Sequence, residues 1–289
     1  PYVSFVQKVD FENYLDPQIS GDELMILPTE KYIFRERGMT AGVGITILPR
    51  FSVEPAFGVR DIFRGSLTES RVLDEGVDLV PRVSLVYDGV SAYTPDNSLY
   101  FTGLYAGSIF SMRYRTDFDH PVDAKSENLL LLHENIRRRW FFKERLSLDF
   151  PLKVWDLERT GFYSLGGFDT VRGYEPGAVS AFRFLLVSTE IERELWAEKE
   201  LRLRIRKAVA RVHQYRVGLF ADTLLAQDSL DTGSPVQAYA SAGAGFSFTI
   251  SSRSNNHFRV RLYIGQPLGE RFAPVVYLRT SLFGFDQKL

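Results

Sequence analysis

The stretch Leu165-Gly166-Gly167-Phe168-Asp169-Thr170-Val171-Arg172-Gly173-Tyr174 interrupts a chain that otherwise consists of alternating, strand-like segments. Its three glycines permit tight backbone conformations that residues with a Cβ atom resist. One cation, Arg172, lies between them. The stretch therefore predicts a sharply folded loop set among strands, and its surroundings differ from the strand and helix that flank a nucleotide-binding glycine loop.

The segments around this loop have a period of two. Between residues 145 and 156 one face is apolar, and the opposite face carries Arg145, Ser147, Asp149 and Lys153. Such alternation predicts a β-strand with one apolar and one polar face. The apolar face consists of Leu146, Leu148, Phe150, Leu152 and Val154.

The polar faces of these segments distinguish a soluble sandwich from a membrane barrel. Both folds alternate, but only a barrel with a wide, wet lumen needs many charged residues on its second face. The sequence supplies such residues in most segments. They are Arg137, Arg139, Arg145, Asp149, Lys153, Glu190, Glu192, Arg216 and Asp222.

Composition narrows the function further. The 289 residues carry a net charge of -1, which argues against a nucleic-acid partner because phosphate binding needs a basic surface. Cysteine is absent, which fits an oxidising compartment but discriminates weakly. No apolar run reaches the roughly 18 residues of a transmembrane helix, whereas a barrel strand needs only about 9 to 11.

Segments with strand character number about twelve, and closed single-chain bacterial barrels have even strand numbers. Residues 2–15 could add a strand or pack as a tail, and 196–211 suits either a strand or a short amphipathic helix. The chain has no compositional break, so we expect one domain over 1–289. The candidate strands are 24–34, 38–48, 51–63, 79–88, 98–114, 127–141, 144–156, 181–194, 212–225, 236–250, 257–266 and 274–285.

The Leu-Gly-Gly and Val-Arg-Gly-Tyr elements of 165–174 resemble the signature of the BamA/TamA/TpsB superfamily of outer-membrane assembly and secretion barrels. The resemblance extends over the C-terminal half, where five candidate strands follow the motif. Residues 218–222 are similar to that family's Phe-x-Asp strand, 241–246 to its Gly-x-Gly-aromatic strand, and 258–268 to its penultimate strand. Upstream, Tyr87-Asp88, Thr94-Pro95 and Gly103 are similar to a family hairpin, without its Arg after Asp88.

The resemblance implies an all-β fold: a transmembrane antiparallel barrel of about 12 to 16 strands, with loop 157–179 folded inward as a plug. No POTRA modules are recognised in the sequence. Arg172 is then expected to pair in the lumen with Asp222, near Phe220 and with Glu190 as a further candidate. The remaining motif residues, which shape and seat the loop, are Gly166, Gly167, Val171, Gly173 and Tyr174.

The function implied by the resemblance is to assist other proteins into or across the outer membrane of a Gram-negative cell. Expected partners are outer-membrane lipid, unfolded client proteins, and periplasmic or membrane accessory subunits, with no cofactor. Two alternatives are open: a two-partner-type secretion pore, and a barrel without POTRA modules that anchors or scaffolds partner subunits.

Enzymatic and metal-binding readings find little support in the sequence. His120, His133, His213 and His257 lack the paired spacing of a metal site. His133 and Asn135 share one strand face, as in an outer-membrane phospholipase, but no serine is placed to complete a catalytic set. We therefore predict no enzymatic activity and no metal.

Overall fold

The computed structural model describes residues 2–20, 23–64, 76–93, 100–117, 119–137, 139–156, 163–196, 201–205, 208–230, 233–252, 257–269 and 274–282. These residues form strands, turns, bends and irregular segments, with no helix among them, so the all-β prediction is confirmed. No helix capable of spanning a membrane occurs in the described part of the chain.

The chain divides into two compact units. The first comprises Pro1–Tyr87, Gly107–Asn128 and Asp149–Phe162, and the second Asp88–Ala106, Leu129–Leu148 and Tyr163–Leu289. β1 to β4 belong to the first unit, as does β5 up to Tyr87. The bounds of these strands are β1 Tyr2–Ser20, β2 Glu23–Gly42, β3 Ile45–Leu48, β4 Phe51–Arg64 and β5 Gly76–Asp88.

The second unit contains the motif and the C-terminal strands, while β7, β8 and β9 contribute residues to both units. The remaining bounds are β6 Ser91–Tyr93, β7 Tyr100–Arg115, β8 Pro121–Arg137, β9 Trp140–Val154, β10 Tyr163–Leu165, β11 Val179–Ala181, β12 Arg183–Trp196, β13 Leu201–Ile205, β14 Ala208–Gln227, β15 Gln237–Ser252, β16 His257–Pro267 and β17 Val275–Leu282.

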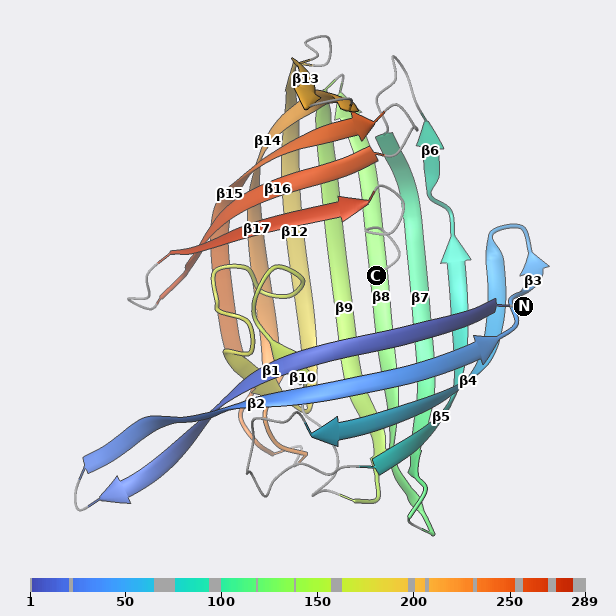
Figure 1. The fold of residues 1–289 in the computed structure, drawn as a ribbon, viewed down its shortest axis with the longest axis vertical. Helices are drawn as coiled ribbons and strands as arrows, with labels where there is room; N and C mark the ends of the chain where they lie inside the picture. Colours follow the sequence, from blue (N-terminus) through green and yellow to red (C-terminus); the bar gives the residue numbers. More distant parts are fainter. Residues whose placement is uncertain are drawn as a thin grey trace. The chain divides into compact units, whose positions relative to one another are not determined.

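The strands follow one another in the sheet in the order β1-β2-β4-β5-β7-β8-β9-β12-β14-β15-β16-β17 (Figure 1). Short strands β3, β6 and β13 pair with β4, β7 and β14, and β10 pairs with β11 in a separate ribbon. A closed barrel also requires hydrogen bonds between its first and last strands. The described residues of β1 and β17 do not pair, so the sheet observed here is not closed.

The structure corrects one predicted boundary and decides two alternatives that the sequence left open. The predicted strands 24–34 and 38–48 overlap one long strand, β2, because its pairing with β1 continues through the charged segment Arg35–Arg37. Residues 2–15, left open as strand or tail, belong to β1. The helix alternative for 196–211 is wrong, because β13 pairs with β14 from Leu201↔Val212 to Ile205↔Ala208.

β14 has two faces, as the period of two predicts, and Asp222 lies on the buried one. Val217 and Leu219 are 38% and 64% exposed, whereas Phe220 and Asp222 are 4% and 1% exposed. On β16, exposed Leu262 and Ile264 likewise alternate with buried Arg261 and Tyr263. Apolar side chains therefore occupy the outer face of these strands and charged side chains the buried face, the reverse of a water-soluble sheet.

β9 follows the same rule, with one exception. Leu146, Leu148 and Leu152 are exposed and Ser147 is buried, as the alternation predicts. Lys153, which was expected on the polar inner face, is exposed with its ammonium 4.7 Å from the centre of the Trp155 ring. The polar face of β9 is therefore buried over only part of its length.

Buried charges in the first unit gather around one carboxylate. Asp78 is fully buried, and its Oδ2 accepts a 3.0 Å hydrogen bond from Arg60 Nη2. Arg115 Nε lies 2.7 Å from Asp78 Oδ1, and Arg113 forms a 2.8 Å ion pair with Asp123. Paired guanidiniums and carboxylates thus line the buried side of this unit, where an isolated charge would be strongly unfavourable.

The largest apolar cluster of the second unit forms where the motif loop meets the sheet. The loop contributes Val171 and Tyr174, which contact strand residues on the inner side of β12 and β14. The sheet and ribbon residues of this cluster are Leu165, Val179, Ala181, Phe184, Leu186, Leu224 and Ala226. The apolar core is therefore a docking site for the loop.

Candidate functional site

The motif loop is closed at its base by the β10–β11 ribbon, in which Leu165 pairs with Val179. Gly166 leaves this ribbon with φ +113°, a conformation that a side chain would strain. Its N–H donates to Thr170 Oγ1 at 2.6 Å, and the N–H of Gly167 donates to the carbonyl of Tyr174 at 2.9 Å. The loop is thus ordered by its own hydrogen bonds. Residues 157–162 of the predicted plug lie outside the described residues.

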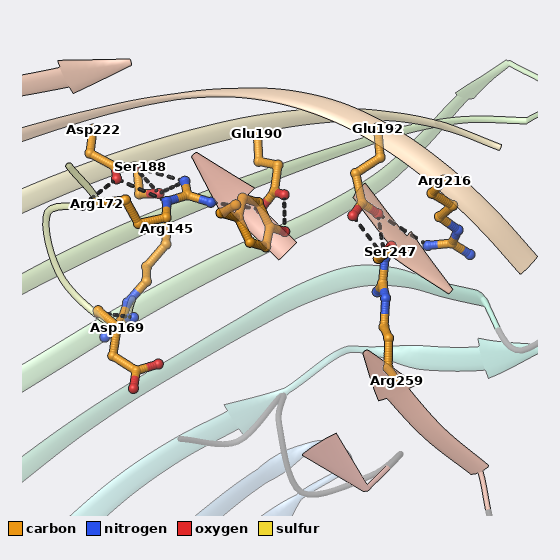
Figure 2. A network of polar contacts seen from close by, with 11 residues as sticks. Arg145, Asp169, Arg172, Ser188, Glu190, Glu192, Arg216, Asp222, Ser247 and Arg259 are labelled. Atoms are coloured by element: carbon orange, nitrogen blue, oxygen red, sulfur yellow. Dashed lines mark hydrogen bonds and ion pairs between the residues drawn. The ribbon is translucent and has the colours of Figure 1, made fainter. Parts of the chain in front are cut away.

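Arg172 lies at the centre of a buried polar network (Figure 2). Its Nε and Nη2 donate to the two carboxylate oxygens of Asp222 at 2.9 and 2.8 Å. The backbone N–H of Arg172 also donates to Asp222 Oδ2, at 2.8 Å. Asp222 therefore holds both the side chain and the backbone of Arg172, in a forked geometry that a lysine could not reproduce.

Further residues surround this guanidinium, among them Ser188, Glu190 and Phe220. Arg172 Nη2 donates to Ser188 Oγ at 3.0 Å, and Nη1 lies 3.3 Å from Glu190 Oε2. The guanidinium carbon lies 3.8 Å from the centre of the Phe220 ring, a favourable cation–π distance. The structure thus brings together all four residues singled out for this pairing: Arg172, Asp222, Phe220 and Glu190.

The charge on Arg172 is strongly stabilised. Burial by itself lowers the pKa of the guanidinium, but hydrogen bonding to Asp222 and the negative charges of Glu190 and Asp222 raise it above its ordinary value. Arg172 therefore stays charged at any physiological pH. The loop is held by a permanent ion pair and does not act as a proton-controlled switch.

The residues on either side of Arg172 anchor the loop by packing. Val171 is fully buried, and Tyr174 is 7% exposed. The Tyr174 ring packs edge-on against Tyr239 of β15 with centroids 5.7 Å apart. These contacts remove apolar area from water and add to the polar attachment of Arg172.

Gly265 of the sheet forms a glycine seat, a position at which the loop backbone lies directly against a strand. Gly265 on β16 pairs with Gly243 on β15. A Cβ atom at Gly265 would lie only 2.6 Å from the Gly173 nitrogen and 2.8 Å from its Cα. Gly173 itself has φ +102°. The close approach thus needs glycine on both sides, at Gly173 and at Gly265, and this role of Gly265 was not predicted from the sequence.

The last strand also binds the loop. The N–H of Gly173 donates to the hydroxyl oxygen of Tyr277 at 3.0 Å, and that hydroxyl donates to the carbonyl of Tyr174 at 2.6 Å. Arg279, two residues further along β17, forms an ion pair with Asp169 and lies over the Phe168 ring. Neither Tyr277 nor Arg279 was predicted as a site residue, although their alternation with exposed Val276 and Leu278 marks an inward face.

A second ionic cluster lies beside the first and is centred on Glu192 of β12. Arg259 Nη2 lies 2.8 Å from both carboxylate oxygens of Glu192, and Arg216 Nη1 lies 3.2 Å from Oε2. Glu190 accepts a hydrogen bond from the Tyr263 hydroxyl. The carboxylates of β12 are therefore engaged by cations or hydroxyl groups, which makes this surface a fixed polar lining.

Metal-ligating side chains do not cluster in the described residues. Within them, no group of three or more His, Cys, Asp or Glu side chains could hold a metal ion. His133 is buried and lines a cavity with Glu192 and Arg259, whereas Asn135 on the same strand is exposed. The side chains of His213 and His257 lie outside the described residues, as do Thr94 and Pro95 of the family-like hairpin.

Comparison of the chain with models of known protein families finds no match, and comparison with curated protein sequences finds no significant match either.

The geometry of Arg172 predicts strong coupling with Asp222. Arg172→Ala and Asp222→Ala should each destabilise the seated loop by about 3–5 kcal/mol, because each leaves a buried charge unpaired. The double variant should cost little more than either single variant, since neighbours in one network are non-additive. Hydrogen exchange of residues 166–174 measures the effect. Arg193→Ala, an exposed arginine on β12, is the matched control, and additive losses would contradict the prediction.

The glycine seat predicts that Gly265→Ala displaces the loop while the strands remain. Overpacking of this kind costs about 1–3 kcal/mol, because the added methyl group would overlap the Gly173 backbone. Faster hydrogen exchange in 166–174, with unchanged exchange in β15 and β16, is the expected result. Gly44→Ala serves as the control, since a Cβ there meets only the Glu54 side chain at ordinary distances of 3.8 Å or more. Unchanged hydrogen exchange of residues 166–174 in Gly265→Ala would show that the loop does not depend on the glycine seat.

Proposed function

We propose that this chain forms a transmembrane β-barrel of the outer membrane, with segment 157–179 folded inward as a plug. The support is the reversed distribution of side chains. Leu219, Val276 and Leu278 are 64%, 61% and 72% exposed, while Arg172, Glu194 and Asp222 are buried. An outer apolar face of this kind would be unfavourable in water and suits contact with lipid.

The proposal includes closure of the sheet. Hydrocarbon offers no hydrogen-bond partners, so an open strand edge costs several kcal/mol for each unsatisfied backbone group. In a membrane, β1 and β17 would therefore pair with each other or with another chain. The resulting barrel would have twelve strands along the observed order, at the lower end of the range expected from the sequence.

Its function, in this proposal, is to help other proteins into or across the outer membrane. The observation that carries it is the forked Arg172–Asp222 pair, which seats a loop with the family-like motif against the C-terminal strands. β17 combines two properties: it ends the sheet, and it holds the loop through Tyr277. An edge strand of this kind can template a client strand through backbone hydrogen bonds.

A secretion pore is the second candidate, favoured by the charged cavity beneath the loop. Residues of the loop and of β9, β12, β16 and β17 line this cavity, so movement of the loop would widen a polar path. An anchor or scaffold for partner subunits is the third candidate. This role needs the apolar outer face. It needs neither a mobile loop nor an opening at the seam, the junction between β1 and β17.

The membrane assignment predicts that the purified protein requires detergent or lipid for solubility. Its circular dichroism should be of the β type, and its electrophoretic mobility should change when the sample is heated, because a folded barrel is more compact than the unfolded chain. Both properties follow from the exposed apolar residues of β14, β16 and β17. A monodisperse monomer in plain aqueous buffer would contradict the assignment.

Templating at the seam predicts that a crosslink between β1 and β17 abolishes client insertion. Val276→Cys on the outer face of β17 would be combined with a series of single cysteines along β1, in a chain that has no native cysteine. Insertion of an unfolded test barrel into vesicles containing the protein is measured by the heat-modifiable mobility of the client. The locked protein should keep its own fold and lose this activity.

The control crosslinks two strands that are already paired. Ile264 and Val276 are register partners on β16 and β17, so a disulfide between cysteines at these positions leaves the seam free. Insertion should survive in this variant. Full insertion by a completely locked β1–β17 variant would refute templating, and secretion of a client through that locked barrel would favour the pore.

A further inference from the structure

The cavity beneath the motif loop has an excess of positive charge. Arg172 and Asp169 of the loop, Glu190 of β12, and side chains of β9, β16 and β17 line it. In total, five cationic side chains and two carboxylates face this space. The cations contributed by strands are Lys143, Arg145, Arg261 and Arg279.

The carboxylates in and beside the cavity already form ion pairs or hydrogen bonds with protein groups. Glu190 lies 3.3 Å from Arg172 and accepts a hydrogen bond from Tyr263, and Asp169 forms an ion pair with Arg279. Asp222, beside the cavity, is occupied by Arg172. The acidic groups thus neutralise Arg172 and Arg279, and the side chains that line the cavity include more cations than carboxylates.

Lys143 is the clearest case. Within the part of the chain that the structure describes, no hydrogen bond or ion pair engages its ammonium group. The charged group that interacts with it most strongly is Arg261, which carries the same charge. Lys143 and Arg261 also line the adjoining cavity around Glu192, where Arg216 and Arg259 hold that carboxylate. Glu190 and Glu192 each attract the Lys143 ammonium group, but each interacts with it less strongly than Arg261, whose like charge repels it in a poorly solvated site.

The loop residues Phe168 and Asp169 fix the positions of several side chains that line the cavity. Arg145 Nη1 donates to the Asp169 carbonyl at 2.6 Å, and Arg279 binds the carboxylate of the same residue (Figure 2 shows Arg145 and Asp169). Phe168 packs edge-on against Tyr263 at 5.3 Å. Two ordered guanidiniums, an ammonium and an aromatic wall therefore surround one space.

We propose that this cavity is a binding site for an oxyanion of the phosphate class. Guanidinium groups offer forked donors that match tetrahedral oxyanions, and an ammonium group adds a compact charge. The committed carboxylates disfavour a cation in the same space. The ligand is either free phosphate or the phosphate of a lipid headgroup, which share this chemistry. The site is independent of the proposed role in protein insertion or secretion.

Titration calorimetry on the full chain in an uncharged sugar detergent tests the site, with sodium phosphate and a short-chain phosphatidic acid as separate probes. Saturable binding of either probe is expected, and tighter binding of the phosphatidic acid would identify a headgroup as the source. Lys143→Gln should weaken binding about tenfold or more, as expected for loss of a hydrogen bond to a charged group.

Lys153→Gln is the matched control, because Lys153 lies on the same strand with its side chain exposed. Its affinity should equal that of the unmodified protein. Heat-modifiable mobility verifies that each variant is folded, and Arg145→Gln replaces Lys143→Gln if the latter fails this check. Absence of saturable binding, equal weakening in the lysine variant and its control, or binding of polyglutamate but of neither phosphate probe would overturn the proposal.

Discussion

The bidentate pair between Arg172 and Asp222 is the interaction on which the second unit depends. It connects a loop to a strand 50 residues later in the chain, and it places a permanent positive charge against the inner face of the sheet. A buried ion pair contributes little net free energy when compared with an apolar pair of the same shape. Its value here is geometric, because only one loop conformation satisfies both carboxylate oxygens.

The surrounding network extends this constraint. Glu190 joins Arg172 to the Tyr263 hydroxyl, and the neighbouring Glu192 binds Arg216 and Arg259. Each of these carboxylates has cationic or hydroxyl partners, which offsets the cost of removing it from water. The strands around this network can therefore keep a charged inner face while exposed positions such as Leu219 and Leu262 are apolar.

Sequence periodicity predicted the strands well, because the two faces of a strand are a local property. The exposed and buried faces of β14 follow directly from the alternation around Asp222, and the family-like motif indicated the partner of Arg172. The continuous strand β2 was not predicted, since the expected strands ended at residue 34 and began again at 38, and only the pairing with β1 shows that Arg35–Arg37 continues the strand. Pairing between strands is a non-local property.

The same limitation explains which site residues were missed. Gly265 and Tyr277 are each ordinary within their own strands, and their importance arises only where the loop backbone approaches them. One strand's pattern shows which face a residue occupies but not which distant segment covers it. The charged face of β17, marked by the alternation of Tyr277 and Arg279 with apolar neighbours, was the only local signal.

The attachment of the loop to β17 has a consequence for the order of folding. Gly173 and Tyr174 bind Tyr277, which follows them by more than 100 residues, and β14, β15 and β16 also come after the loop in the chain. Contacts of such long sequence separation form late, because the intervening chain must first be ordered. The loop thus reaches its final position only after the last strand is in place, and a seated loop reports that the chain has been assembled to its end.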